Sequence, residues 1–240
     1  MNILVSGVSK GLGLNITEIL IKNGWTVYGV SRSKTEDVKN LIKEHPQTFH
    51  WLSCDLSVSQ DVQKNIFKNW IGMQTPIHGF VNNAALAYDD LITNMNLFSL
   101  ERMYRINVFA PMNLTKYVIR HMLLHHVHGS LVHLSSISVH TGYKGLSMYA
   151  SSKGAIEAFS KNIAREWGEV GIRSNCIVAG FMETEMSSFL TEEQKNRIYS
   201  RTSLKKVVDK SSVAETIAFL LSENAKSITG QNIHVDSGTI

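Results

Sequence analysis

The sequence predicts an α/β fold in which helices cover both faces of a doubly wound, parallel, seven-stranded sheet. Short apolar runs alternate with longer segments of helical periodicity, which is the order of elements in a parallel sheet. The chain has 240 residues, a length that α/β folds often fill as one domain. Hydrophobic residues make up 43% and charged residues 18%, so a large core can form. We therefore expect one domain, residues 1–240, in three α/β/α layers.

Seven short apolar runs are expected to form the strands, because such runs bounded by polar residues and glycine are typical of buried parallel strands. In chain order they are Asn2–Ser6, Thr26–Val30, Thr48–Ser53, Ile77–Asn82, Ser130–Ser135, Ile172–Val178 and Asn232–Val235. Helical periodicity is found between them, near residues 11–23, 35–44, 58–72, 99–126, 148–168 and 211–222. Since helices separate successive strands, all seven strands can run parallel.

The connection from about Gly180 to Val208 differs from the others, because it is long and carries only one short helical pattern, TEEQKNRIYS. Long connections in compact domains are usually lids or binding loops. This one follows a strand end, where the ligands of open α/β sheets bind. We expect residues 180–208 to form a substrate lid.

Charge and composition exclude several classes of function. The net charge is only +4 and Lys205-Lys206 is the only adjacent basic pair, so we expect no nucleic-acid partner. Residues 1–7 carry no charged side chain and only a short apolar run, which indicates a first strand and not a signal peptide. No segment approaches the roughly 18 apolar residues of a membrane span. Cys54 and Cys176 lie far apart without metal-ligand spacing, which favours reduced thiols and a cytoplasmic location.

The segment SGVSKGLG, Ser6 to Gly13, follows the first expected strand and opens a helix. In that context Gly7 permits the tight turn, Gly11 lets the backbone approach a diphosphate, and Gly13 lets the helix pack closely on the strand. The helix N-terminus adds unpaired N–H groups and positive potential for phosphates. A βα turn without a ligand would look similar, but the position at the first βα junction favours a dinucleotide site and a Rossmann-type sheet.

The segment VSRSK, residues 30–34, indicates which dinucleotide binds. A sheet that binds NAD usually carries Asp or Glu at the end of the second strand, whereas arginine there suits the 2′-phosphate of NADP. Here the strand ends in Ser31 and Arg32, and the first acidic residue is Glu36. Lys10 in the glycine loop could add a second positive charge. Arg32 could also be a plain surface charge, but NADP(H) is the predicted cofactor.

Asn107, Ser136, Tyr149 and Lys153 form the predicted catalytic set. Tyr149 and Lys153 lie one helical turn apart on one face of a helix. The phenol has an ordinary pKa of about 10, and a nearby cation lowers a phenol pKa toward the working pH of an acid or base. We therefore expect Lys153 to lower the pKa of Tyr149 and to hold a ribose with its remaining donors. Ser136 ends a strand and can hydrogen-bond a substrate oxygen, while Asn107 is a polar residue inside an apolar helix.

Four histidines occur in HMLLHHVHG: His121, His125, His126 and His128. His121 and His125 have i,i+4 spacing, but no carboxylate or cysteine accompanies them as a zinc ligand. We expect exposed imidazoles near a helix C-terminus and no metal.

Taken together, these motifs resemble the short-chain dehydrogenase/reductase family over essentially the whole chain. The matching segments are SGVSKGLG, CDLS at 54–57, NNAA at 82–85, Asn107, Ser135-Ser136, YASSK at 149–153, GFMET at 180–184 and ITGQNIHVDSG at 228–238. The thirteen residues from Ser136 to Tyr149 match the spacing of bacterial 3-oxoacyl-(acyl carrier protein) reductases. Ser6 departs from the family's usual threonine but keeps a hydroxyl.

The resemblance implies roles for individual residues. Tyr149 would be the catalytic acid/base, Ser136 would orient the carbonyl, Lys153 would bind the nicotinamide ribose, and Asn107 would hold a water in a proton relay. Cofactor contacts are implied at Gly7, Ser9, Lys10, Gly11, Leu12, Gly13, Ser31, Arg32, Asp55, Leu56, Asn82, Ala84, Tyr149, Lys153, Met182 and Thr184. Members of the family also form tetramers by pairing their two long helices and their last strand.

The sequence therefore predicts an NADP(H)-dependent oxidoreductase that interconverts a carbonyl and a secondary alcohol, with 3-oxoacyl reduction as the first candidate. A sugar or another small polar carbonyl is the alternative substrate, and a non-catalytic NADP-binding sensor or scaffold is the alternative class. Reductases that use acyl carrier protein resemble one another in two arginines beside the active-site entrance. This chain has Val127 and Val170 at those positions, so we expect weak binding to that acidic partner or none.

Overall fold

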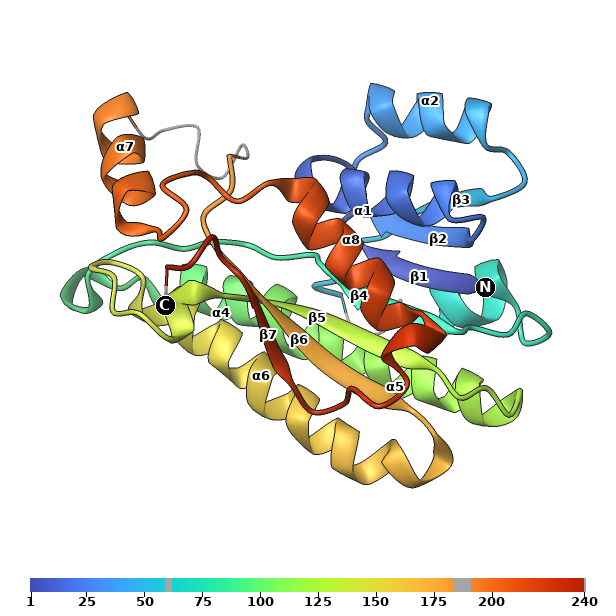
Figure 1. Ribbon diagram of the computed structural model, residues 1–240. Helices are drawn as coiled ribbons and strands as arrows, with labels where there is room; N and C mark the ends of the chain where they lie inside the picture. The colour runs from blue at the N-terminus through green and yellow to red at the C-terminus, as the bar shows by residue number, and fades with distance from the viewer. Residues whose placement is uncertain (59–61, 184–190, 240) are drawn as a thin grey trace.

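The computed structural model describes residues 1–58, 62–183 and 191–239. Within them, seven parallel strands form one sheet in the order β3-β2-β1-β4-β5-β6-β7 (Figure 1). The strands are β1 (Asn2–Ser6), β2 (Thr26–Ser31), β3 (Phe49–Ser53), β4 (Gly79–Asn82), β5 (Ser130–Ser136), β6 (Arg173–Ala179) and β7 (Asn232–Val235). The predicted doubly wound fold is confirmed, with strand limits that differ from the prediction by at most two residues.

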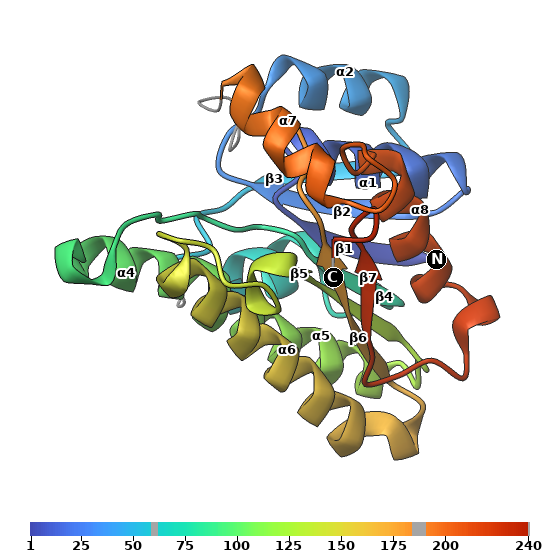
Figure 2. The same ribbon diagram turned by 60° about the vertical axis from the view of Figure 1, so that its left-hand side comes forward.

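Helices cover both faces of the sheet. The helices α1 (Gly11–Lys22), α2 (Glu36–Glu44) and α8 (Lys210–Leu221) lie on one face, and α5 (Ala110–Leu124) and α6 (Ser147–Trp167) lie on the other (Figures 1 and 2). The π-helical segment η1 (Val62–Ile71) packs with α5 and α6. The helix α7 (Glu192–Arg201) is the short helical pattern expected inside the long connection, and it stands apart from both layers.

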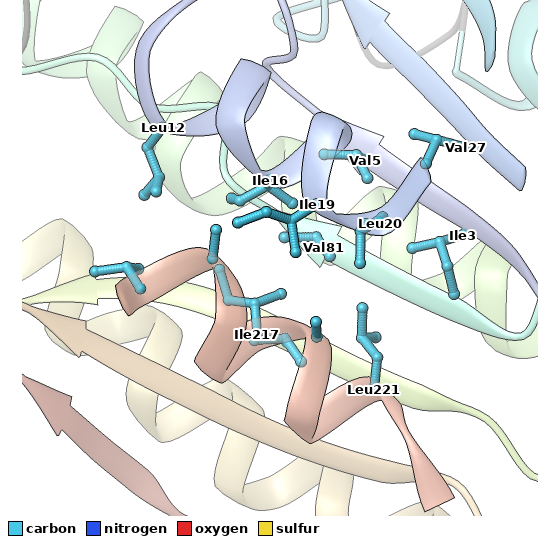
Figure 3. Packing of buried hydrophobic residues seen from close by; sticks show 14 of the residues in the cluster. Ile3, Val5, Leu12, Ile16, Ile19, Leu20, Val27, Val81, Ile217 and Leu221 are labelled. Atoms are coloured by element: carbon cyan, nitrogen blue, oxygen red, sulfur yellow. The ribbon is translucent and has the colours of Figure 1, made fainter. Parts of the chain in front are cut away.

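The buried core consists of two apolar layers, one on each face of the sheet. On the first face, Ile16 and Leu20 of α1 point toward Ile217 and Leu221 of α8, above the strand residue Val81 (Figure 3). All five are at most 4% exposed, so each contributes about 1.5–3 kcal/mol from burial of its side chain. These layers fix the strand ends that carry the polar residues described below.

The helix expected near residues 99–126 is interrupted. It consists of α4 (Leu97–Tyr104), a π-helical turn η3 (Arg105–Phe109) and α5. Pro111 explains the interruption, because proline has no N–H to donate to the carbonyl of residue 107 and its ring crowds that carbonyl. The helix widens there instead, and π-helical turns of this kind occur frequently at functional sites. Asn107, one of the four predicted catalytic residues, lies in this turn.

The histidine prediction is partly wrong. His121 is 3% exposed and its ring packs against Phe67 at a centroid distance of 5.5 Å, so it belongs to the core and not to the surface. Burial lowers its pKa, which keeps the ring neutral. Packing in the folded protein determines that residue 121 lies on the buried side of α5. The residue type alone did not reveal this. Within the described ranges, no group of three or more His, Cys, Asp or Glu residues could hold a metal ion.

The length and apolar character of the helices bear on whether the chain could cross a bilayer. Across residues 1–58, 62–183 and 191–239, none combines the length and the apolar character that crossing a membrane requires.

Candidate active site

The predicted site residues gather at the carboxyl edge of the sheet. The glycine loop follows β1, Asn82 ends β4, and Ser136 ends β5. The order β3-β2-β1-β4 shows that the chain reverses its direction of sheet growth between β1 and β4. Ligands of doubly wound sheets bind at such a switch point, outside the carboxyl ends of the strands.

The glycine loop has the geometry that its sequence predicts. Gly7 has φ +78°, and a Cβ on it would lie 2.9 Å from the Cα of Ala84. A Cβ on Gly13 would lie 1.9 Å from the carbonyl oxygen of Gly7, so any side chain there would separate α1 from β1. Gly11 has φ +59°, and among the described residues no heavy atom lies within 4 Å of its would-be Cβ. The loop is therefore closed toward the protein and open beside Gly11.

The start of α1 is suited to an anion. Its N-cap residue Lys10 has extended backbone and makes no side-chain capping hydrogen bond, and the first turn carries no acidic residue. The first N–H groups of a helix have no partner inside the helix, and the helix dipole favours negative charge there. Ser9 and Leu12 flank this turn, and the carbonyl of Ser9 accepts a 2.8 Å hydrogen bond from the hydroxyl of Thr35. This hydrogen bond connects the glycine loop to Thr35, the N-cap residue of α2.

The hydroxyl of Ser6 connects the glycine loop to the end of β4. It accepts hydrogen bonds from the backbone N–H groups of Asn83 and Ala84, both at 3.1 Å. The Asn83 side chain donates to the carbonyls of Ser6 and Gly7 at 3.2 and 3.0 Å. We did not predict a role for Asn83, although the NNAA segment that contains it was recognised. Asn82 itself is 4% exposed at the end of β4.

The end of β2 presents basic side chains. Arg32 is exposed, and Lys34 lies 5.3 Å from the ring centroid of Trp51. Ser31 is 6% exposed; its hydroxyl donates to the carbonyl of Ser33 at 3.1 Å and accepts from the Trp51 indole N–H at 2.9 Å. The Ser31 hydroxyl is therefore already used within the protein, and Arg32 is the accessible polar group of this pair.

Asp55 and Leu56 lie at the end of β3. Hydrogen bonds from the backbone and side chain of Ser57 hold the pKa of Asp55 below its usual value, and the charge of Arg32 acts in the same direction. Leu56 is 7% exposed and belongs to the core. Met182, which follows β6, is partly buried and packs against the core layer that contains α1 and α8. Thr184, the other residue expected to contact the carboxamide end, lies outside the described residues.

Three of the four predicted catalytic residues converge at the carboxyl end of β5. Lys153 is 4% exposed, its Nζ donates to the carbonyl of Leu134 at 2.8 Å, and it lies 5.8 Å from the ring centroid of Tyr149. The Tyr149 hydroxyl hydrogen-bonds the side chain of Ser136. A strand end and one face of α6 thus bring together a hydroxyl, a phenol and an amine.

The expectation that Lys153 lowers the pKa of Tyr149 is wrong for this structure. Burial raises the pKa of Tyr149 to about 12, with a smaller contribution from the carboxylate of Asp89, and only the hydrogen bond from Ser136 opposes them. Burial also lowers the pKa of Lys153 to about 8. Four-residue spacing predicts the proximity of the two groups, but desolvation disfavours the charged form of each and is the largest cause of both shifts.

Asn107 lies deeper than the other three residues. Its Oδ1 accepts from the N–H of Leu86 at 2.8 Å, and its Nδ2 donates to the Leu86 carbonyl at 2.9 Å and to the Ser152 hydroxyl at 3.0 Å. The side chain therefore joins the π-helical turn, the segment after β4 and α6. Its expected role in holding a water stays a prediction.

The two valines that replace arginines are not where we expected them. Val127 precedes β5 and Val170 precedes β6, at the amino ends of parallel strands, whereas Ser136 ends β5. Seven residues of strand span about 20 Å, so both positions lie at the opposite edge of the sheet from the site of the same chain. The predicted strand bounds already implied this separation, because Val127 and Val170 precede their strands whereas Ser136 lies at the end of one.

Comparison with known proteins places the chain in a family. The model of the family described as enoyl-(acyl carrier protein) reductase matches residues 7–239. The chain belongs to the short-chain dehydrogenase/reductase family. The predicted membership, and with it the prediction of an oxidoreductase of this family, is confirmed.

Curated members of the short-chain dehydrogenase/reductase family match nearly the whole chain. The 3-oxoacyl-[acyl-carrier-protein] reductase FabG of Staphylococcus epidermidis is 29% identical over 238 residues, which are 98% of this chain and 97% of that protein. The L-xylulose reductase of Caenorhabditis elegans is 30% identical over 241 residues, 98% of this chain and 94% of that protein. The names of these two similar relatives thus refer to different substrates.

Solved structures agree with this fold. The structure described as ElxO with NADP bound has a TM-score of 0.90 at 26% identity and covers 99% of this chain and 98% of that one. A gluconate 5-dehydrogenase from Burkholderia cenocepacia, solved with NADP and tartrate, has a TM-score of 0.92 at 22% identity, covering 99% and 94%. At 22% identity, the similarity to the gluconate 5-dehydrogenase supports the fold and nothing about substrate or mechanism.

Proposed function

We propose that the chain is an NADP(H)-dependent oxidoreductase that interconverts a carbonyl and a secondary alcohol. One observation carries the proposal: Ser136, Tyr149 and Lys153 meet at the carboxyl end of β5, on the edge of the sheet that also bears the glycine loop. A hydrogen-bond donor and a proton donor can orient and protonate a carbonyl oxygen, and an amine beside them can hold the ribose of a cofactor. The similar ElxO was solved with NADP bound, which supports the choice of cofactor.

The residues at this edge fit NADP(H). The uncapped start of α1 and the open space beside Gly11 would receive the diphosphate, because backbone N–H groups there have no side-chain cap. Arg32 would pair with the 2′-phosphate, since a guanidinium binds phosphate oxygens through two parallel N–H groups. Asp55 lies near Arg32 and would contact the adenine, as would Leu56. Met182 and Thr184 would hold the carboxamide end.

The protein's own part in the reaction is to supply and orient a proton. When bound, the nicotinamide supplies the hydride that reduces the carbonyl carbon and takes it up in the reverse reaction. Tyr149 donates its phenolic proton to the carbonyl oxygen, and Ser136 hydrogen-bonds the same oxygen. Lys153 uses one N–H on Leu134, which leaves further donors for ribose hydroxyls. The raised pKa of Tyr149 means that the phenol is protonated at neutral pH, which is the form that donates a proton in carbonyl reduction.

A 3-oxoacyl compound is the first substrate class and a sugar the second, because relatives of near-equal identity carry names of both kinds. Acyl carrier protein is a doubtful partner, and we propose a free or differently carried carbonyl. Val127 and Val170 bear on this only if another copy of the chain brings the amino edge of its sheet near the entrance. Residues from about 180 to 208, of which 184–190 lie outside the described residues, would form the substrate lid of a single catalytic domain. We propose that this domain assembles as a cytoplasmic homotetramer or dimer.

A panel of carbonyls tests this proposal. Ethyl acetoacetate, a small 3-oxo ester, and L-xylulose represent the two classes, and an acyl-carrier 3-oxo thioester tests the partner. We expect NADPH absorbance to fall with at least one carbonyl, and to fall about 10²–10⁴-fold more slowly in Tyr149→Phe. NADPH binding without turnover on any panel member would favour the non-catalytic sensor or scaffold instead. A much higher kcat/KM on the carrier-bound thioester than on a small thioester of the same acid would restore the carrier protein as partner.

A further inference from the structure

Glu157 is a buried carboxylate on α6 that the chemistry above does not use. The residue is 8% exposed. It follows Lys153 by four residues and Tyr149 by eight, so the three side chains lie along one face of the helix. A carboxylate is costly to bury unless several donors satisfy it. Its partners therefore indicate what keeps it there.

Three segments of the chain donate to this one side chain. The Ser135 hydroxyl and the His140 Nε2, at 3.1 Å, both contact Oε1, and the Asn232 Nδ2 donates to Oε2 at 2.7 Å. Because an ionised carboxylate only accepts hydrogen bonds, Ser135 must donate and the His140 Nε2 must carry a hydrogen. Glu157 thus links the end of β5, the connection after it and the first residue of β7.

These contacts enclose Ser136. Ser135 precedes it directly, and His140 follows the short 3₁₀ turn Ile137–Val139 that begins after it. One carboxylate therefore holds the chain on both sides of Ser136. The neighbouring anchor on the same helix is Lys153, whose Nζ binds the carbonyl of Leu134. Residues of α6 consequently fix the strand end to which the proposed substrate-orienting serine belongs.

We propose that Glu157 is a positioning residue of the active site. It holds Ser136 at the correct place relative to the Tyr149 phenol by binding Ser135 and His140, and Asn232 keeps the carboxylate itself in place. This inference rests on the proposed function, since it assigns a geometric requirement of the same proton transfer. A displacement of about 1 Å at reacting groups can cost about 10²-fold in rate.

The test compares turnover of ethyl acetoacetate, NADPH affinity by fluorescence and thermal unfolding in a set of variants. Glu157→Leu removes every acceptor, and we expect kcat to fall about 10- to 100-fold with an NADPH Kd within about twofold of wild type. Glu157→Gln keeps one acceptor and an amide that can pair with a reoriented Asn232, so most of the turnover should return. Ser135→Ala removes one donor with little change in volume and should lower kcat even if Glu157→Leu does not fold.

Ser160→Ala is the matched control. The Ser160 hydroxyl hydrogen-bonds that of Ser174 at 2.8 Å, so the variant removes a buried contact between the same helix and β6 without touching the segment around Ser136. Glu157→Leu and Ser135→Ala with kcat within twofold of wild type, or with losses no larger than that of Ser160→Ala, would overturn the inference. Normal turnover in Tyr149→Phe would overturn the proposed function and this inference with it.

Discussion

At the scale of single residues, the proposed acid/base is the phenol of Tyr149. The pKa of Tyr149 is raised to about 12, so the fraction of phenolate grows as pH rises toward that value. Alcohol oxidation needs phenolate as the base, whereas carbonyl reduction needs phenol as the acid. We expect kcat for oxidation to increase steadily from pH 7 to about 10, and kcat for reduction to show no such increase. Stopped assays of alcohol oxidation and of carbonyl reduction at each pH measure the two kcat values.

Tyr199 provides the control for that profile, because its pKa is also raised to about 12, by limited burial and by its hydrogen bond to Glu183. Tyr199→Phe should keep the rise of oxidation with pH. A wild-type oxidation rate that is already maximal at pH 7 would show that the phenol in the working enzyme is not the base described here.

Arg32 is the residue that we propose to determine the choice between NADPH and NADH. Arg32→Ala should weaken NADPH binding about 10- to 100-fold, because a hydrogen-bonded charge contributes about 1.5–3 kcal/mol and NADH has no 2′-phosphate to lose. Binding of NADH should change little. Fluorescence titration with both cofactors gives the two affinities. Arg165→Ala, which removes an exposed charge from the last turn of α6, should alter neither. Equal losses for NADPH and NADH would contradict the assignment.

At the scale of elements, Pro111 shapes the helix that carries Asn107. Pro111→Ala supplies an N–H that can bond to the carbonyl of residue 107 and close a regular α-helical turn. The Asn107 side chain would then leave its partners Leu86 and Ser152, and we expect a fall in kcat without a comparable fall in melting temperature. The control is Pro76→Ala in a loop, which changes only the freedom of the unfolded chain by about 0.4–1 kcal/mol. Wild-type kcat in Pro111→Ala would show that the π-helical turn is dispensable.

At the scale of the whole molecule, a buried histidine makes stability depend on pH. His133 in β5 is 0% exposed between the rings of Phe80 and Phe159, and burial lowers its pKa from 6.5 to about 3. The unfolded chain binds this proton below about pH 6.5 while the folded protein does not, so stability falls with decreasing pH between about 6.5 and 3. The slope from this residue is at most about 1.4 kcal/mol per pH unit.

Chemical unfolding at pH 7.5 and pH 4.5 measures the effect. The loss of unfolding free energy from pH 7.5 to pH 4.5 should be smaller in His133→Leu than in wild type. It should stay unchanged in His126→Gln, because the side chain of His126 is exposed. An undiminished difference in His133→Leu would mean that other groups cause the loss of stability in acid.

The sequence by itself determined the fold class, the order of the elements and the place of the cofactor loop. Each of these depends on local rules: periodicity distinguishes strands from helices, the positive φ of Gly7 favours glycine, and the close approach at Gly13 leaves no room for a side chain. The spacing of Tyr149 and Lys153 also predicted their common helix face. Such information is contained in a few neighbouring residues, so it can be read without the tertiary structure.

The tertiary structure decided what depends on burial and on contacts between distant segments. The pKa of Tyr149 is raised and not lowered, because desolvation at the folded site is the largest influence on the phenol. The structure confirms the parallel pairing that places the starts of β5 and β6, and with them Val127 and Val170, at the edge of the sheet opposite Ser136. Glu157 gathers Ser135, His140 and Asn232 from three segments, up to 75 residues apart. Hydrogen bonds over such separations leave no periodic pattern in the sequence, and only the folded chain brings their partners together.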